Sequence, residues 1–104
     1  MLFRSDSRIT EHGNTEVSTT TIDSELASSE CSLIKLNING YELEALKGAR
    51  STIRRCKPKI QVLLALGNIV EIPKFLLSCN ESYTFYLGYY DQYNSLDNII
   101  LYAI

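Results

Sequence analysis

The chain has 104 residues, a formal net charge of −2 and a hydrophobic fraction of 45%. This length suits one small domain, the weak charge gives no reason to expect nucleic acid or an anionic membrane as partner, and no apolar run approaches the roughly 20 residues that cross a bilayer. The three cysteines are odd in number and widely spaced, which favours reduced thiols and a cytoplasmic location over a disulfide framework.

Residues 1–30 form a polar segment that is rich in Ser, Thr, Asp and Glu and poor in large apolar side chains. We expect a poorly packed arm here, in which the β-branched run Val17–Ile22 forms an edge strand. Asp23 is placed to N-cap a short helical turn over Ser24–Ser29. The only histidine, His12, has no cluster of metal-ligating residues around it, so no metal site is predicted.

The stretch LIKLNINGYELEALKGA, residues 33–49, admits two interpretations. Apolar and polar residues alternate on both sides of Asn39-Gly40, which is typical of a β-hairpin. Alternatively, a buried strand over Leu33–Ile38 turns sharply into a helix. The residues after the turn are good helix formers, with acids at the start, from Glu42, and bases at the end, before Pro58. We therefore predict a strand, a corner and one helix that ends before the proline.

The remaining elements follow from the same patterns, and we expect residues 31–104 to form one α/β domain. The chain order is strand, helix, strand, helix, strand, strand, which predicts a parallel sheet with right-handed crossovers. The short link between the last two strands makes that pair antiparallel. The further elements predicted are a strand over Lys59–Leu66, a helix over Glu71–Cys79, and strands over Tyr83–Tyr90 and Asn98–Ile104.

Several segments carry a family resemblance that covers residues 20–104. The chain is similar to the C-terminal half of a class I S-adenosylmethionine-dependent methyltransferase, and more specifically resembles the FkbM family, with its elements TLDSL, IKIDVEGAE and LKGA followed by KP. The matching segments are Thr21–Leu26, Ile34–Glu42, Leu46–Ala49 and Lys57-Pro58. The resemblance implies a Rossmann-like sheet and transfer of a methyl group from S-adenosylmethionine to a hydroxyl of a sugar or polyketide-like acceptor.

The first departure from this family concerns the cofactor. A class I methyltransferase binds S-adenosylmethionine with a glycine-rich loop after its first strand, because the absent side chains let the backbone approach the ligand closely. The five glycines of this chain are isolated. We therefore expect the chain to be the C-terminal half only, with no cofactor bound by this fragment alone and no activity by itself.

The second departure lies at the corner, where the family has DVEG and this chain has Asn37-Ile38-Asn39-Gly40. The resemblance places Asn37, Asn39 and Glu42 at a remnant acceptor site beside the transferable methyl group. An amide forms hydrogen bonds but does not act as a base near neutral pH. The alternative interpretation is structural, since Asn-Gly is a favoured turn pair and Glu42 suits the first turn of a helix.

A second function is a non-catalytic interaction or oligomerisation module. The strand over Leu33–Ile38 is expected to lack a neighbour on one side, and an unpaired strand edge invites pairing with another chain. The predicted partner is a second copy or a missing N-terminal half.

Overall fold

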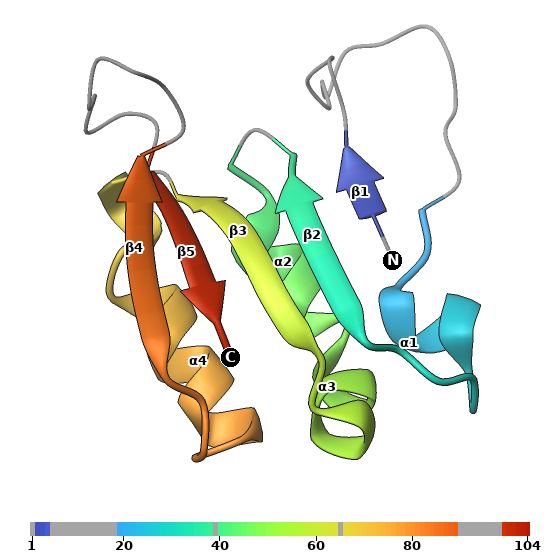
Figure 1. Cartoon of the computed structure of the whole chain (residues 1–104). Helices are drawn as coiled ribbons and strands as arrows, with labels where there is room; N and C mark the ends of the chain where they lie inside the picture. The colour runs from blue at the N-terminus through green and yellow to red at the C-terminus, as the bar shows by residue number, and fades with distance from the viewer. Residues whose placement is uncertain (1, 5–18, 39, 65, 90–98) are drawn as a thin grey trace, which may run out of the picture.

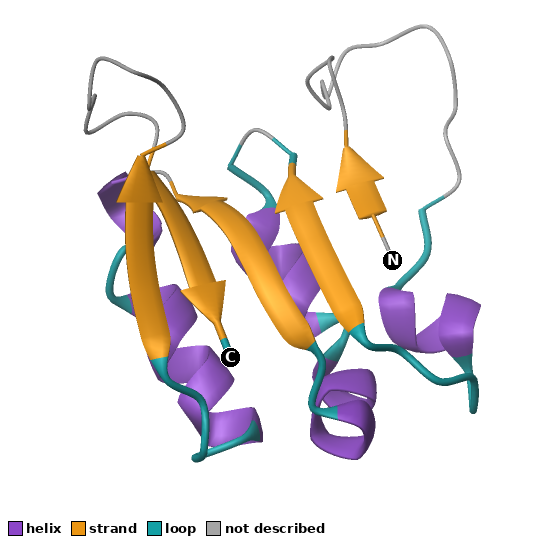
Figure 2. Ribbon diagram, in the orientation of Figure 1, coloured by secondary structure: helices purple, strands orange, loops and turns teal. Residues whose placement is uncertain are grey.

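The computed structural model describes residues 2–4, 19–38, 40–64, 66–89 and 99–104. Five strands form one sheet, and helices α2, α3 and α4 lie behind it in Figure 1 and Figure 2. The strands are β1 (Leu2–Arg4), β2 (Leu33–Asn37), β3 (Lys59–Leu64), β4 (Phe85–Tyr89) and β5 (Ile99–Ala103). The helices are α1 (Ile22–Leu26), α2 (Glu42–Lys47), α3 (Arg50–Cys56) and α4 (Glu71–Cys79), with a 3-10 turn η1 at Leu66–Asn68.

The sheet has the strand order β1-β2-β3-β5-β4. Strands β1, β2 and β3 are parallel, and β5 is antiparallel to both of its neighbours, β3 and β4. Helices α2 and α3 connect β2 to β3, and α4 connects β3 to β4. The predicted α/β fold, with parallel crossovers and a final antiparallel pair, is therefore confirmed. The carboxyl ends of β2 and β3 lie at the same edge of the sheet, where open α/β sheets bind ligands.

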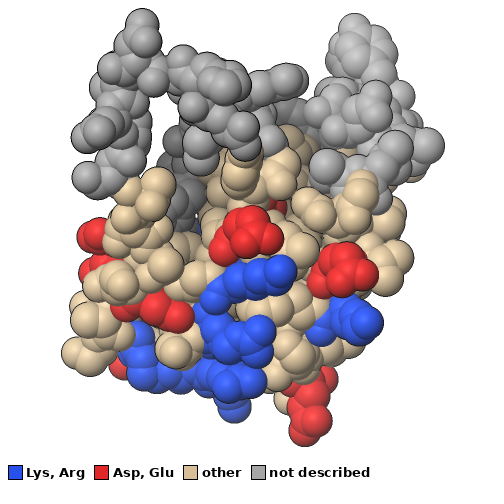
Figure 3. Space-filling model, turned by 180° about the vertical axis from the view of Figure 1, so that it is seen from behind, with Lys and Arg blue, Asp and Glu red and all other residues tan. Residues whose placement is uncertain are grey.

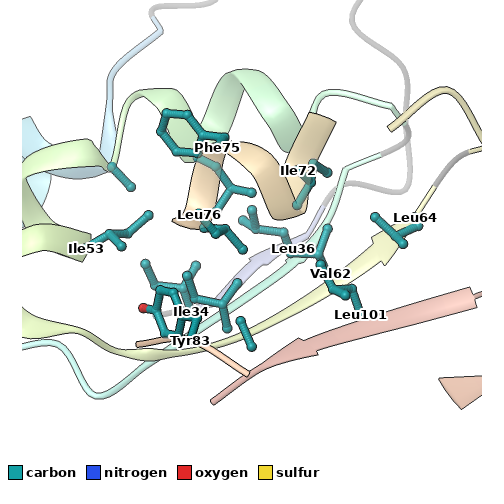
Figure 4. Packing of buried hydrophobic residues seen from close by; sticks show 14 of the residues in the cluster. Ile34, Leu36, Ile53, Val62, Leu64, Ile72, Phe75, Leu76, Tyr83 and Leu101 are labelled. Atoms are coloured by element: carbon teal, nitrogen blue, oxygen red, sulfur yellow. The ribbon is translucent and has the colours of Figure 1, made fainter. Parts of the chain in front are cut away.

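The hydrophobic core lies between the sheet and the helices behind it. Along β2, Ile34 and Leu36 are fully buried while Lys35 between them is exposed, which is the alternation of a strand with one covered face. Figure 4 shows the side chains of the sheet converging on those of the helices. The labelled sheet residues are Ile34, Leu36, Val62, Leu64 and Leu101, and the labelled helical residues are Ile53, Ile72, Phe75 and Leu76.

The N-terminal part of the chain differs from the predicted arm. The first strand is β1, whereas Thr19–Thr21 is not in a strand and Ile22 begins α1. Ile22 is 2% exposed and belongs to the core, so burial in the tertiary structure overrides its β-propensity. Thr21, rather than Asp23, caps α1, because its Oγ1 accepts a hydrogen bond of 3.1 Å from the Ser24 N–H. Val17, Ser18 and His12 lie outside the described residues.

The helix predicted from Glu42 to Pro58 is two helices, α2 and α3, which meet at Gly48 and Ala49. In a continuous helix the Gly48 carbonyl would accept from the Thr52 N–H. Instead it accepts from the Asp23 N–H at 2.9 Å, and the Thr52 N–H donates to Asp23 Oδ1 at 2.8 Å. The break between α2 and α3 therefore depends on Asp23 of α1. Because Asp23 lies outside residues 42–57, the local sequence pattern could not predict the break.

The edge predicted at Leu33–Ile38 is covered in part. Strand β1 pairs with β2, with Leu2 opposite Lys35 and Arg4 opposite Asn37, so the prediction of an unpaired strand is wrong.

The three cysteines are free. Among the described residues, no helix is long and apolar enough to cross a membrane.

Candidate functional site

The corner after β2 is a strand-to-helix turn. The Tyr41 N–H donates to the Ile38 carbonyl at 3.3 Å, and α2 begins at Glu42. Gly40 has a φ of +97°, and a Cβ built there would meet nothing within 4 Å. Glycine is therefore required at this position by the backbone conformation and not by lack of space. The hairpin interpretation is excluded, and the predicted corner is confirmed.

Glu42 is the most unusual side chain of this corner. It is 2% exposed, and its Oε2 has no hydrogen-bond partner among the residues that the structure describes. Burial of a carboxylate without a compensating donor is unfavourable. The sequence pattern predicted an acid in the first turn of a helix, a position that is usually solvated, so the burial of Glu42 was missed.

Asn37 reaches the same corner from the strand side. It is the last residue of β2, is half-buried, and lies opposite Arg4 of β1 in the register. Beyond the turn, Tyr41 is 43% exposed, so the outer surface of the corner is formed partly by an aromatic ring. The structure thus brings Asn37 and Glu42 to one end of β2, whereas Asn39 lies outside the described residues.

Asp23, the aspartate of the TIDSEL segment, is a structural residue. Its Oδ1 accepts from the Thr52 N–H at 2.8 Å and its Oδ2 from the Ser51 N–H at 3.1 Å. These two donors belong to the first turn of α3, where backbone N–H groups have no partner within the helix. Asp23 therefore caps a helix that lies more than 25 residues further along the chain.

Gly48 of the LKGA segment belongs to the same contact. A Cβ at Gly48 would lie 3.1 Å from the Thr21 Cβ and 3.2 Å from the Thr21 Cγ2. Leu46 and Ala49 beside it are fully buried. Two of the segments that carry the family resemblance, TIDSEL and LKGA, thus meet each other and hold α1 against the joint between α2 and α3.

The tyrosines in β4 and just before it divide between two roles. Tyr83 is buried, its hydroxyl donates to the Pro58 carbonyl, and burial raises the pKa of this phenol to about 12. Tyr86 and Tyr89 are more than half exposed on β4. Tyr86 and Tyr89, unlike Tyr83, are therefore available to another molecule.

A group of basic side chains lies on the helical face of the molecule (Figure 3). Several have local partners: Arg50 lies 4.9 Å from the Phe75 ring centroid, Arg55 donates to the Ala27 carbonyl at 3.0 Å, and Lys47 pairs with Glu44. We interpret this face as a solvated helical surface that stabilises its own neighbourhood.

A bound metal ion or S-adenosylmethionine would need a cluster of ligating side chains or a glycine-rich turn, respectively. Among the described residues, no group of three His, Cys, Asp or Glu side chains is placed to hold a metal ion. The described glycines, Gly40, Gly48, Gly67 and Gly88, are isolated, and none belongs to a glycine-rich turn after a strand. Within the residues that the structure describes, a glycine-rich turn of the kind that lets backbone approach a nucleoside cofactor is therefore not found.

Comparison with known proteins identifies the family. The model of the "Methyltransferase FkbM domain" family matches residues 2–93. The crystal structure of methyltransferase FkbM from Methylobacillus flagellatus KT superimposes with a TM-score of 0.63 and 29% sequence identity. The match covers 70% of this chain and 20% of that one, so it spans about a fifth of the solved protein. No curated protein matches the chain. With most of its length matched by the family model, the chain belongs to the FkbM methyltransferase family.

Proposed function

We propose that the corner formed by Asn37 and Glu42 is the acceptor side of an FkbM-type methyltransferase site. The reaction class is transfer of a methyl group from S-adenosylmethionine to a hydroxyl of a sugar or polyketide-like acceptor, in the cytoplasm. The location is supported by the three free cysteines.

One observation carries this proposal: the buried Oε2 of Glu42 has no partner in the described part of the chain. A buried polar atom of this kind calls for an explanation, and one explanation is that a ligand supplies the missing donor. Glu42 lies at the carboxyl end of β2, the edge at which open α/β sheets bind ligands. A hydroxyl group is a donor that matches a carboxylate oxygen, either directly or through one bridging water.

The chemistry assigned to each residue follows from its side chain. When the acceptor oxygen takes the methyl group it loses its proton, and the Glu42 carboxylate is the group at this corner that accepts a proton. Asn37 replaces an acid of the family pattern, and its amide is suited to orient the hydroxyl by hydrogen bonding. Methyl transfer depends strongly on alignment of the reacting atoms, so an orienting amide remains useful where a base has been replaced.

We propose further that this chain by itself neither binds S-adenosylmethionine nor transfers a methyl group. This is supported by the isolated glycines and by the small share of the solved methyltransferase that the chain matches. The cofactor-binding residues would then come from another part of the protein or from another chain.

Two titrations test the two halves of the proposal separately. Calorimetry of residues 1–104 with S-adenosylmethionine is expected to show no binding, and micromolar affinity would contradict the cofactor proposal.

An amide NMR titration with a simple methyl glycoside is expected to shift the resonances of residues 38–42. Glu42→Gln should remove these shifts, whereas Glu44→Gln, which changes a 68% exposed acid of the same helix, should keep them. Equal shifts in both variants would contradict the role of Glu42.

A further inference from the structure

Strand β4 has β5 as its one neighbour among the described strands, so its other edge is open. Its sequence, FYLGY, contains neither a charged residue nor a proline. Natural sheets usually protect an edge strand with residues of those kinds. Tyr86, Leu87 and Tyr89 are 55%, 61% and 53% exposed, so the open edge is also lined by apolar and aromatic side chains.

The backbone groups that point outward from β4 follow from its pairing with β5. Thr84 and Ile104 exchange two hydrogen bonds, of 2.9 and 3.0 Å, and are therefore a hydrogen-bonded pair of the antiparallel ladder. Such pairs recur at every second residue, so Tyr86 and Gly88 also bond toward β5. The N–H and C=O groups of Phe85, Leu87 and Tyr89 consequently point away from the sheet.

We propose that β4 pairs with β4 of a second copy of this chain, antiparallel and about a two-fold axis at Leu87. In this register Leu87 lies opposite its own copy, and Phe85 lies opposite Tyr89. All the outward backbone groups of both strands then face a partner. An axis at Tyr86 or Gly88 would leave one outward residue of each strand without one, so the Leu87 register is favoured.

The side chains agree with the same register. Tyr86 of one copy lies opposite Gly88 of the other, where the ring of Tyr102 already lies close, with its Cε2 3.3 Å from the position of a Cβ at Gly88. The incoming Tyr86 ring would therefore pack beside Tyr102 on that face. On the other face, an aromatic pair of Phe85 and Tyr89 flanks a pair of leucines on each side of the axis. The strand is thus complementary to itself, which favours a second copy over an unrelated peptide as the occupant.

This inference does not depend on the proposed methyl transfer. Strands β3 and β5 lie between β2, which carries the corner, and β4. The dimer would join two sheets edge to edge and leave both corners unchanged.

Sedimentation equilibrium of the full chain over a dilution series tests the proposal, and we expect a reversible dimer. Leu87→Lys places two like charges opposite each other and should raise the dissociation constant at least about tenfold. The control is Leu33→Lys, the same change at a 45% exposed strand residue of β2, which should dimerise like the unmodified chain. A monomer at every concentration, or equal dimerisation of both variants, would overturn the proposal.

A crosslinking experiment tests the register and does not require the lysine variant to fold. Leu87→Cys places two thiols opposite each other across the axis, whereas Tyr86→Cys places each thiol opposite Gly88. Mild oxidation followed by peptide mapping should therefore give a Cys-to-Cys link at position 87 much faster than at position 86. Equal rates at both positions would contradict the two-fold axis at Leu87.

Discussion

Two carboxylates of this small protein, Asp23 and Glu42, stand in opposite situations. Asp23 is half-buried and accepts backbone N–H groups on both oxygens, at 2.8 and 3.1 Å. Glu42 is more deeply buried, at 2% exposure, yet one of its oxygens has no partner among the described residues. Both lie in segments by which the chain resembles its family. Asp23 thus stabilises the fold, whereas the proposed function assigns Glu42 to a ligand.

The physical difference lies in what each acid does for the folded chain. Asp23 accepts hydrogen bonds from the first turn of α3 and links that helix to α1, so its carboxylate stabilises the folded state. Glu42 gains no such bond in the described structure, and an unpaired buried carboxylate lowers stability. Residues that break a local rule of folding are often found at functional sites.

The largest effect is expected from removing the satisfied acid. Asp23→Ala leaves the N–H groups of Ser51 and Thr52 without their partner and should lower the free energy of unfolding by about 2 kcal/mol. Urea unfolding measures this change. Glu25→Ala, which alters an exposed acid of the same short helix, is the control and should change stability little. Equal losses of stability in the two variants would show that the hydrogen bonds to Asp23 are not what stabilises this part of the fold.

High pH tests another satisfied group of the fold, Tyr83. Its pKa is raised from 10.0 to about 12 by burial, so between these values the unfolded chain releases a proton that the folded chain keeps. The contribution of Tyr83 to the free energy of unfolding is fully present below pH 10. The free energy of unfolding should fall by up to roughly 2 kcal/mol as the pH rises to 12. Unfolding of Tyr83→Phe, measured over the same range, should lack this part of the pH dependence. If the free energy of unfolding of Tyr83→Phe fell with pH as steeply as that of the unmodified chain, Tyr83 would not be the source of this pH dependence.

A smaller effect is expected at the joint between α2 and α3. Gly48→Ala brings a methyl group within about 3.1 Å of Thr21 and should cost about 1 kcal/mol. The Thr21→Ser, Gly48→Ala double variant, which lacks the opposing Thr21 methyl group, should recover part of that loss. Thermal unfolding of the variants measures both changes, and a stabilising Gly48→Ala would show that the joint is loosely packed.

The features predicted from the sequence are those encoded locally. Alternating side chains specified β2, short apolar runs specified β3 and β5, and the helix-forming residues after Gly40 distinguished a corner from a hairpin. Features that depend on distant residues were missed. The break at Gly48 requires Asp23, and the position of β1 requires the edge of β2. Leu2–Arg4 is too short to show a periodic pattern at all.

The candidate site shows the same division. Its place at the end of β2 followed from the strand and the glycine, and its residues followed from the family resemblance. The burial of Glu42 did not, because an acid in the first turn of a helix is usually solvated. That burial is set by how α2 packs against the sheet, which only the folded structure contains.

The most direct test of this comparison neutralises each acid without changing its shape. The free energies of unfolding of Asp23→Asn and Glu42→Gln should be measured side by side at neutral pH. We predict that Asp23→Asn is destabilised by about 1 kcal/mol or more, because one accepting oxygen becomes a donor that faces an N–H group. Glu42→Gln should be as stable as the unmodified chain or more so. A loss at Glu42 as large as that at Asp23 would contradict the account, since it would show that the fold itself requires Glu42.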